Sequence, residues 1–151
     1  MSIPAYPEFA PIDMHMRPDL HPRLVMLKDG ISEFTFADLF LFRHKYQYRL
    51  STLPDKHIAV SGVEEGKEFF MLPCGVSDID LMHELFETHD YLKNLSESAI
   101  ESHRIDLEKA GYRVEEDRDN FDYLYLRKNL AHLPGKKLHK KRNLVNAFVN
   151  N

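Results

Sequence analysis

The sequence predicts an α+β fold in which helices flank a mostly antiparallel sheet. Apolar residues recur at helical spacing in some segments and form short β-rich runs in others. These segments do not alternate strictly between strand and helix, which disfavours a parallel α/β sheet. The length of 151 residues, with 43% apolar and 29% charged residues, fits one soluble domain.

The first segment carries three prolines, so residues 1–14 are predicted to be an extended lead-in. Residues 15–151 are predicted to form a single lobe that ends in a basic amphipathic helix. A short helix is expected over residues 19–28. Pro22 would have to sit in its first turn, where a missing amide costs little.

The next helix should begin after Thr35. Thr35 and Asp38 have the spacing of an N-terminal capping pair, so a helix is expected from Phe36 to about Tyr46. The segment is apolar nearly all round, which predicts burial between layers.

Two apolar, β-rich runs then predict a β-hairpin. They are His57–Val63 and Lys67–Leu72, and the three residues Glu64–Gly66 between them contain a glycine. Two helices should follow, one capped by Ser77 and ending near residue 89, the other over residues 96–110.

The last third of the chain predicts two strands and a helix. The expected strands are Tyr112–Glu116 and Phe121–Arg127, of which the second is rich in β-formers. Lys137–Asn150 has apolar residues at helical spacing. The apolar face of that helix consists of Leu138, Val145, Phe148 and Val149.

The charge distribution is the strongest functional signal. The chain has 20 basic and 24 acidic residues, a formal net charge of −4. Residues 123–151 contain seven basic residues and no acid, so they carry +7 while residues 1–122 carry −11. Such asymmetry suggests an anionic partner. The candidates are the phosphates of a cofactor, a tRNA, a lipid headgroup, or the acidic body itself.

Five cations fall within two turns at the start of the last predicted helix, where backbone amides lack intrahelical acceptors. The expected anion-binding residues are Lys136, Lys137, His139, Lys140, Lys141, Arg142 and Asn143. Arg142 is suited to grip a phosphate or carboxylate with two hydrogen bonds. The alternative is a solvated face that pairs with the acidic body. Tyr123 and Tyr125 either stack on bases or fill a sheet face.

The acidic stretch before this segment offers a general base. Glu116 and Asp119 are the candidate catalytic residues, because a carboxylate can take a proton from an attacking amine or hydroxyl. The alternative is a charged, solvated loop. Cys74 is expected to be a small apolar residue at a strand end rather than a nucleophile. The nine histidines show no metal-ligand spacing, so no metal site is expected.

The cellular compartment is predicted from three features. A single cysteine excludes an intramolecular disulfide and fits a reducing compartment. The first residues lack the basic region and apolar stretch of a signal peptide. No run approaches the roughly 20 apolar residues that cross a bilayer. We therefore expect a cytoplasmic protein without a transmembrane segment.

Three stretches carry a family resemblance: Gly30–Leu39, Glu115–Tyr125 and Gly135–Asn143. The last two contain the motifs D-R-D-N-F-D-Y and G-K-K-x-H-K-K-R-N, which are specific when they occur together. The chain, from about Pro11 onward, resembles a bacterial family of unknown function that is related to the C-terminal region of phosphatidylglycerol lysyltransferases.

The resemblance implies a GNAT-like acyltransferase fold. Members of the family typically carry two lobes of this fold, and this chain resembles the first lobe. It implies direct transfer of an aminoacyl or acyl group from aminoacyl-tRNA or acyl-CoA, with a second lobe or a homodimer partner completing the site. The Gly-rich pyrophosphate loop usual in that fold is not visible among the six glycines. The alternatives are a non-catalytic module that binds tRNA or another RNA, and a structural partner lobe.

Overall fold

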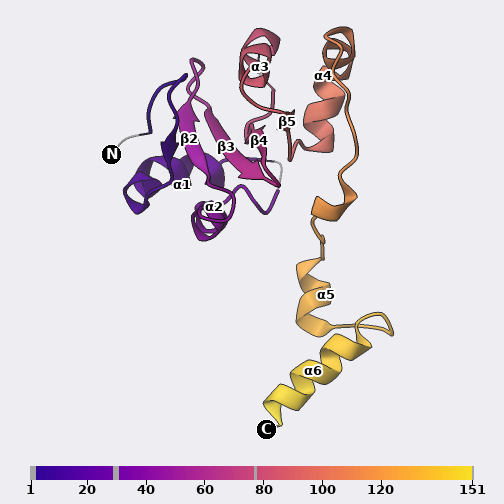
Figure 1. The fold of residues 1–151 in the computed structure, drawn as a ribbon. Coiled ribbons are helices and arrows are strands. Elements are labelled where there is room, and N and C mark those ends of the chain that lie inside the picture. The colour runs from indigo at the N-terminus through magenta and orange to yellow at the C-terminus, as the bar shows by residue number, and fades with distance from the viewer. Residues whose placement is uncertain (1–2, 29–30, 77, 151) are drawn as a thin grey trace. The chain divides into compact units, whose positions relative to one another are not determined.

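A computed structural model describes residues 3–28, 31–76 and 78–150, and Figure 1 shows its fold. Within these ranges helices and short strands alternate irregularly. The elements are β1 (Ala10–Pro11), η1 (Met14–Met16), α1 (Arg17–Val25), α2 (Phe36–Phe42), β2 (Arg49–Thr52), β3 (Ile58–Glu64), β4 (Lys67–Met71), α3 (Ile79–Phe86), β5 (Tyr91–Leu92), α4 (Glu97–Lys109), η2 (Arg118–Asn120), α5 (Arg127–His132) and α6 (His139–Val149).

The chain clusters into two compact units, unit 1 (Met1–Asn120) and unit 2 (Phe121–Asn151). Unit 1 contains the sheet and α1–α4, and unit 2 contains α5 and α6. Each unit is described by itself. The division into a lead-in and a single lobe, expected from the sequence, stays a prediction.

The sheet of unit 1 has the strand order β1-β2-β3-β4-β5. The first three pairings are antiparallel, and only β4 and β5 run parallel. Parallel neighbours need a crossover connection, which α3 provides here. The predicted α+β class with a mostly antiparallel sheet is therefore confirmed.

Helices cover both faces of this sheet. Neighbouring residues of a strand point to opposite faces, so adjacent residues of β4 join different buried clusters. Phe69 belongs to a buried cluster with side chains of α1 and α2, including Leu20 and Leu39. Phe70 belongs to a second cluster with Met82 of α3 and Leu107 of α4. Figure 1 shows the corresponding arrangement, with α1 and α2 on one side and α3 and α4 on the other.

The predicted hairpin is confirmed as β3 and β4, with a shorter loop than expected. Glu64 pairs with Lys67, so only Glu65 and Gly66 form the turn, and both have positive φ angles of 52° and 79°. Two consecutive left-handed residues define the type I′ turn that suits a two-residue hairpin.

A glycine lets the aromatic side chains approach β3 closely. Gly62 lies opposite Phe69 in the β3–β4 register. A Cβ at this position would lie 2.6 Å from Phe69 Cζ and 2.9 Å from the Tyr46 carbonyl oxygen. The absence of a side chain at Gly62 is therefore what allows Phe69 to pack here.

The cap of α2 is confirmed, but its predicted burial is wrong. The Asp38 amide donates to Thr35 Oγ1 at 3.1 Å. The helix ends at Phe42, however, and only Phe36 and Leu39 are buried, while Leu41 is 70% exposed. The reason is that one face of α2 packs against the core, while the described residues leave Leu41 on the other face largely uncovered.

The position of Pro22 was also predicted wrongly. The 3-10 turn η1 leads directly into α1, so the helix begins at Arg17 and Pro22 lies inside it. Part of the expected lead-in forms β1, an edge strand that pairs with β2.

The two middle helices are confirmed, with one change of cap. Ser77, the expected cap of α3, lies outside the described residues; Asp78 Oδ1 accepts from the Asp80 amide at 2.9 Å. Ser96 caps α4, and Gly111 follows that helix, as expected, with a φ of 82°.

Neither of the two late strands forms. Tyr112–Glu116 is irregular, and Phe121–Arg127 runs without regular structure into α5. A strand needs a hydrogen-bonded neighbour, and neither segment has one in the part of the chain described. Tyr123 and Leu124 are consequently 88% and 98% exposed. The last predicted helix is confirmed as α6, whose apolar residues Val145, Phe148 and Val149 are exposed.

Candidate functional site

The seven predicted anion-binding residues all lie in unit 2, in the turn before α6 and in its first turns. The structure thereby brings the predicted residues into one segment. Lys136 and Lys137 belong to the turn, and His139 opens the helix. Lys140, Lys141, Arg142 and Asn143 follow on α6.

Three of the seven residues are engaged within unit 2. Arg142 Nη1 donates to the Leu133 carbonyl at 2.7 Å, and Arg142 Nη2 lies 3.3 Å from His139 Nδ1. Asn143 Nδ2 lies 3.2 Å from His139 Nε2. These contacts connect α6 to the end of α5 and fix the guanidinium, which is half-buried. Arg142 is thus partly structural, which the sequence did not indicate.

The four lysines are exposed and are the residues that remain open to a ligand. No ion pair joins any of them to a carboxylate in the described ranges. Lys141 Nζ lies 5.5 Å from the centre of the Tyr125 ring, which is a cation–π distance. The alternative of a solvated face that pairs with the acidic body stays a prediction.

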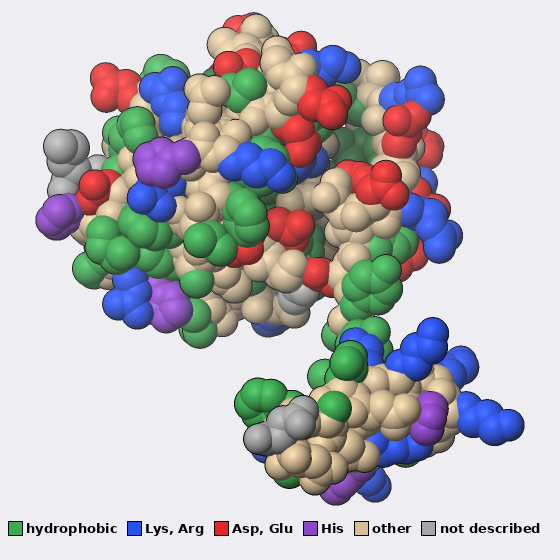
Figure 2. All heavy atoms as spheres, turned by 60° about the horizontal axis from the view of Figure 1, so that its bottom comes forward, with side chains coloured by type: hydrophobic (Ala, Val, Ile, Leu, Met, Phe, Trp, Pro, Cys, Tyr) green, Lys and Arg blue, Asp and Glu red, His purple; other side chains and the backbone are tan. Residues whose placement is uncertain are grey.

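The start of α6, like the starts of α1 and α5, has no side-chain cap. Side chains of Thr35, Asp78 and Ser96 occupy the first amides of α2, α3 and α4. Leu138, the N-cap of α6, makes no side-chain hydrogen bond, and the His139 amide donates to the Lys136 carbonyl at 3.2 Å. The Lys140 and Lys141 amides belong to the first turn, where amides lack intrahelical acceptors. Unit 2 contains seven Lys or Arg residues and one acid, Asp122. Figure 2 shows Lys and Arg side chains gathered on this unit.

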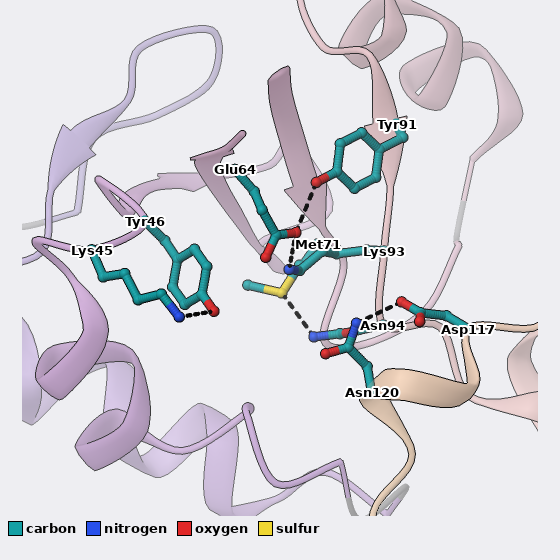
Figure 3. Close-up of polar contacts among 9 residues, drawn as sticks. All are labelled: Lys45, Tyr46, Glu64, Met71, Tyr91, Lys93, Asn94, Asp117 and Asn120. Atoms are coloured by element: carbon teal, nitrogen blue, oxygen red, sulfur yellow. Dashed lines mark hydrogen bonds and ion pairs between the residues drawn. The ribbon is translucent and has the colours of Figure 1, made fainter. Parts of the chain in front are cut away.

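The candidate general bases lie in an exposed segment of unit 1. Glu116 forms a surface ion pair with Arg118 at 4.0 Å, and Asp119 belongs to η2. Their neighbour Asp117 accepts a hydrogen bond from Asn120 at 2.6 Å, as Figure 3 shows. Neither candidate lines a pocket described below. Their catalytic role stays a prediction.

Sequence reasoning missed a polar cluster where β5 meets the hairpin (Figure 3). Lys93 Nζ and the Tyr91 hydroxyl each lie 3.0 Å from Glu64 Oε2. The Lys93 side chain is only 10% exposed, and its ammonium lies 4.4 Å from the centre of the Phe69 ring. No motif signals this cluster, because Glu64 and Lys93 are 29 residues apart and β5 has only two residues.

The cluster changes the acidity of its members. Burial by itself would raise the pKa of Glu64, but the hydrogen bonds from Lys93 and Tyr91 outweigh it and lower that pKa below its usual value. Burial, followed by the hydrogen bond to Glu64, raises the pKa of Tyr91. Glu64 is therefore ionised and Tyr91 neutral at pH 7. Together they fasten the parallel strand β5 to the sheet.

A pocket of about 300 Å³ opens at the carboxyl ends of the parallel strands β4 and β5. In open sheets this is where ligands commonly bind. Leu72 to Gly75 follow β4 and line one side, and Asn94 follows β5. Asn94 has a φ of 59° and donates from Nδ2 to Met71 Sδ at 3.3 Å. The lining combines apolar side chains with polar groups, among them Lys28, Asn94 and Ser96.

Cys74, which lines this pocket, is exposed and unpaired. Although the residue is exposed, neighbouring atoms partly shield the thiol from water. This partial burial and the nearby Asp55 carboxylate raise the pKa of Cys74, and Arg23 partly opposes the effect. The thiol is therefore protonated at pH 7 and is a poor nucleophile.

Two further findings concern metals and membranes. Across residues 3–28, 31–76 and 78–150, no three His, Cys, Asp or Glu side chains come together as they would to hold a metal ion. In the same residues no helix has the length and apolar character needed to span a bilayer.

The fold and the basic segment define an α+β domain with a positively charged helical extension. Comparison with known families matches residues 25–151 to the model described as "Phosphatidylglycerol lysyltransferase, C-terminal". The chain therefore belongs to the family of phosphatidylglycerol lysyltransferase C-terminal domains.

A crystal structure of a conserved protein of unknown function from Bacteroides thetaiotaomicron VPI-5482 is similar to this chain. The two share 26% sequence identity with a TM-score of 0.71. The match covers 94% of this chain and 50% of that chain, so this chain spans half the length of that protein. A search among curated proteins found no match.

Proposed function

We propose that this chain is one GNAT-like lobe of a phosphatidylglycerol-lysyltransferase-like aminoacyl or acyltransferase. Its basic segment, residues 136–143, binds the anionic part of a donor or acceptor. Aminoacyl-tRNA and acyl-CoA are the donors that this class implies, and an anionic lipid headgroup is the corresponding acceptor. A second lobe or a homodimer partner completes the site.

The observation that carries the proposal is the state of the α6 start. Four exposed lysines lie in the turn before α6 and in its first turn, the helix has no side-chain cap, and unit 2 holds only one acid in its sequence. Ammonium groups and free amides both favour an anion, and phosphate oxygens accept from both. By contrast, the start of α3 after β4 is occupied by its own Asp78 carboxylate. The start of α6 is therefore a more favourable place for a phosphate to bind than the start of α3.

Transfer in this class is a direct attack by an amine or hydroxyl on an activated acyl group. Such a reaction depends on positioning, a base and stabilisation of the oxyanion. The basic segment supplies positioning and charge. Glu116 and Asp119 are the proposed bases, and their exposure in unit 1 means that a bound substrate or a partner lobe has to complete their surroundings.

A charge reversal tests the proposal. We expect Lys140→Glu combined with Lys141→Glu to weaken binding of labelled aminoacyl-tRNA or acyl-CoA at least tenfold, since each phosphate contact is charge-assisted. Lys67→Glu combined with Lys109→Glu is the matched control, because both lysines are exposed in unit 1 and the charge change is the same. Unchanged binding of every anionic donor to the first variant would show that the assigned site is wrong.

Non-catalytic RNA binding is the second candidate. It is favoured by Tyr123, which is 88% exposed, and by Tyr125 beside Lys141, because exposed aromatic rings among cations suit base stacking. This function predicts that unacylated tRNA binds as well as aminoacyl-tRNA. It also predicts that affinity falls steeply with salt. A preference for the acylated form would favour the transferase lobe instead.

A further inference from the structure

The sheet of unit 1 ends in an open edge at β5. This strand is the last in the sheet order, and among the described residues no strand lies beyond it (Figure 1). The Lys93 amide donates to the Phe70 carbonyl at 3.1 Å. Backbone groups of successive strand residues point alternately to the two sides, so the amide and carbonyl of Leu92 point away from β4. The edge therefore offers a donor and an acceptor to a further strand.

Both faces of the sheet are apolar at this edge. The Tyr91 ring lies 5.7 Å from the Phe69 ring and packs against the cluster that contains α1 and α2 side chains. Leu92 packs against the cluster of Phe70 on the opposite face. Tyr91 and Leu92 are only half-buried. A strand added beside them would extend both clusters, and it therefore needs apolar side chains on both of its faces.

Unit 2 contains a segment with this pattern. Residues Tyr123–Leu126 alternate Tyr and Leu, so an extended chain would place the two tyrosines on one face and the two leucines on the other. All four side chains are exposed, and the backbone of Leu126 is already extended. The same Tyr-Leu order occurs in β5. The segment thus has the composition of an inner strand, although it forms no strand in the described structure.

Charges near the two segments favour one orientation. Asp90 precedes β5, and its amide donates to the Glu68 carbonyl at 2.8 Å, so two exposed acids lie at the start of this strand. Arg127 and Lys128 directly follow the Tyr-Leu segment and are exposed. An antiparallel pairing places these cations at the acidic end of β5, whereas a parallel pairing places them at the end that carries Lys93. Opposite charges across strands stabilise a pair, so the antiparallel orientation is favoured.

The two units also carry opposite net charges. Unit 1 has 13 basic and 23 acidic residues, a formal charge of −10, and unit 2 has seven basic residues and one acid, a formal charge of +6. Unit 2 of one copy is therefore attracted to unit 1 of another. A second copy of this chain presents the open edge, the apolar faces and the acidic charge that the Tyr-Leu segment requires.

We propose that Tyr123–Leu126 of one copy adds to β5 of a second copy as an antiparallel strand, and that the exchange is reciprocal. Tyr125 would lie opposite Tyr91 and Leu124 opposite Leu92, because a slip by one residue would put tyrosines against leucines. Reciprocal exchange gives a closed dimer with twofold symmetry. The proposal uses β5 and the Tyr-Leu segment alone, so it does not rest on anion binding at α6.

A proline tests whether backbone pairing joins the copies. Leu124 is 98% exposed, so its replacement disturbs no packing within the chain. Leu124→Pro removes the amide that a strand donates, and we expect the dimer dissociation constant, measured by sedimentation equilibrium, to rise about tenfold or more. Leu124→Val is the matched control, because valine keeps the amide and suits a strand. A natural chain that is monomeric at every concentration, or equal dissociation constants for the two variants, would overturn the proposal.

Cysteine cross-linking tests the register between copies. In a Cys74→Ser background, a Leu92→Cys chain is mixed with a size-tagged Leu124→Cys chain, so any mixed disulfide joins two copies. We expect the mixed disulfide to form faster than with Leu41→Cys in place of Leu92→Cys, since Leu41 is exposed on α2, away from β5. Equal rates would contradict the assigned edge. Leu124→Pro should still bind pyrophosphate at residues 136–143, which separates this test from that of the proposed function.

Discussion

Replacing Glu64 by Gln tests how the polar cluster holds β5. Glu64 accepts from both Lys93 and Tyr91 at 3.0 Å, and Lys93 is only 10% exposed. The Gln side chain keeps the shape but removes the charge, which leaves the Lys93 ammonium without its anion. Hydrogen bonds to charged groups contribute about 1.5–3 kcal/mol each, and the 34% exposure of Glu64 reduces that figure. We therefore expect a loss of about 2 kcal/mol in the free energy of unfolding at pH 7.

The effect should depend on pH with a defined sign. The pKa of Glu64 is lowered in the folded protein relative to the unfolded chain. A group of this kind stabilises the fold above its unfolded pKa and ceases to do so as the pH falls through its folded pKa. The difference between the natural chain and Glu64→Gln should thus be full at pH 7 and shrink below about pH 4.

The measurement is urea denaturation followed by circular dichroism at pH 7 and at several acidic values. Glu65→Gln is the control, since Glu65 is the exposed neighbour in the turn and the charge change is identical. Lys93→Met, alone and combined with Glu64→Gln, completes a double-mutant cycle. Equal stability of the Glu64 and Glu65 variants at pH 7, or a difference that grows at low pH, would refute the reasoning.

Three further predictions concern stability, and thermal unfolding measures each of them. Gly62→Ala should lower the free energy of unfolding by about 1–3 kcal/mol, because its Cβ would lie 2.6 Å from Phe69 Cζ; an unchanged melting temperature would show that the ring moves aside freely. Ser51→Ala should raise that free energy by about 1 kcal/mol, because the Ser51 hydroxyl is buried without a partner; a loss would point to a bond that the structure does not show. Ser96→Ala should cost about 1 kcal/mol through loss of the α4 cap, and a neutral result would mean that packing alone starts this helix.

Local signals predicted the hairpin and the α2 cap well. Thr35 acts on an amide three residues away, and the β3–β4 turn needs only neighbouring residues. The sequence therefore contains the whole interaction. The same holds for the concentration of cations at α6, which follows from spacing alone.

The errors concern features that depend on distant partners. Phe121–Arg127 has the composition of a strand, yet no neighbouring strand pairs with it in the described structure. The strand β5 has two residues and exists because β4 and the Glu64–Lys93 pair hold it. The hydrogen bond from Arg23 to the Lys56 carbonyl likewise joins α1 to a turn 33 residues later, which no local pattern indicates.

The central claim is that residues 136–143 of unit 2 bind an anion, and titration with pyrophosphate under nuclear magnetic resonance tests it most directly. Pyrophosphate carries the phosphate oxygens that a tRNA, a cofactor and a lipid headgroup have in common. The account predicts saturable shifts of the backbone amides of residues 136–143, abolished by Lys140→Glu with Lys141→Glu. Shifts confined to residues 3–120, with the α6 start unchanged, would contradict it.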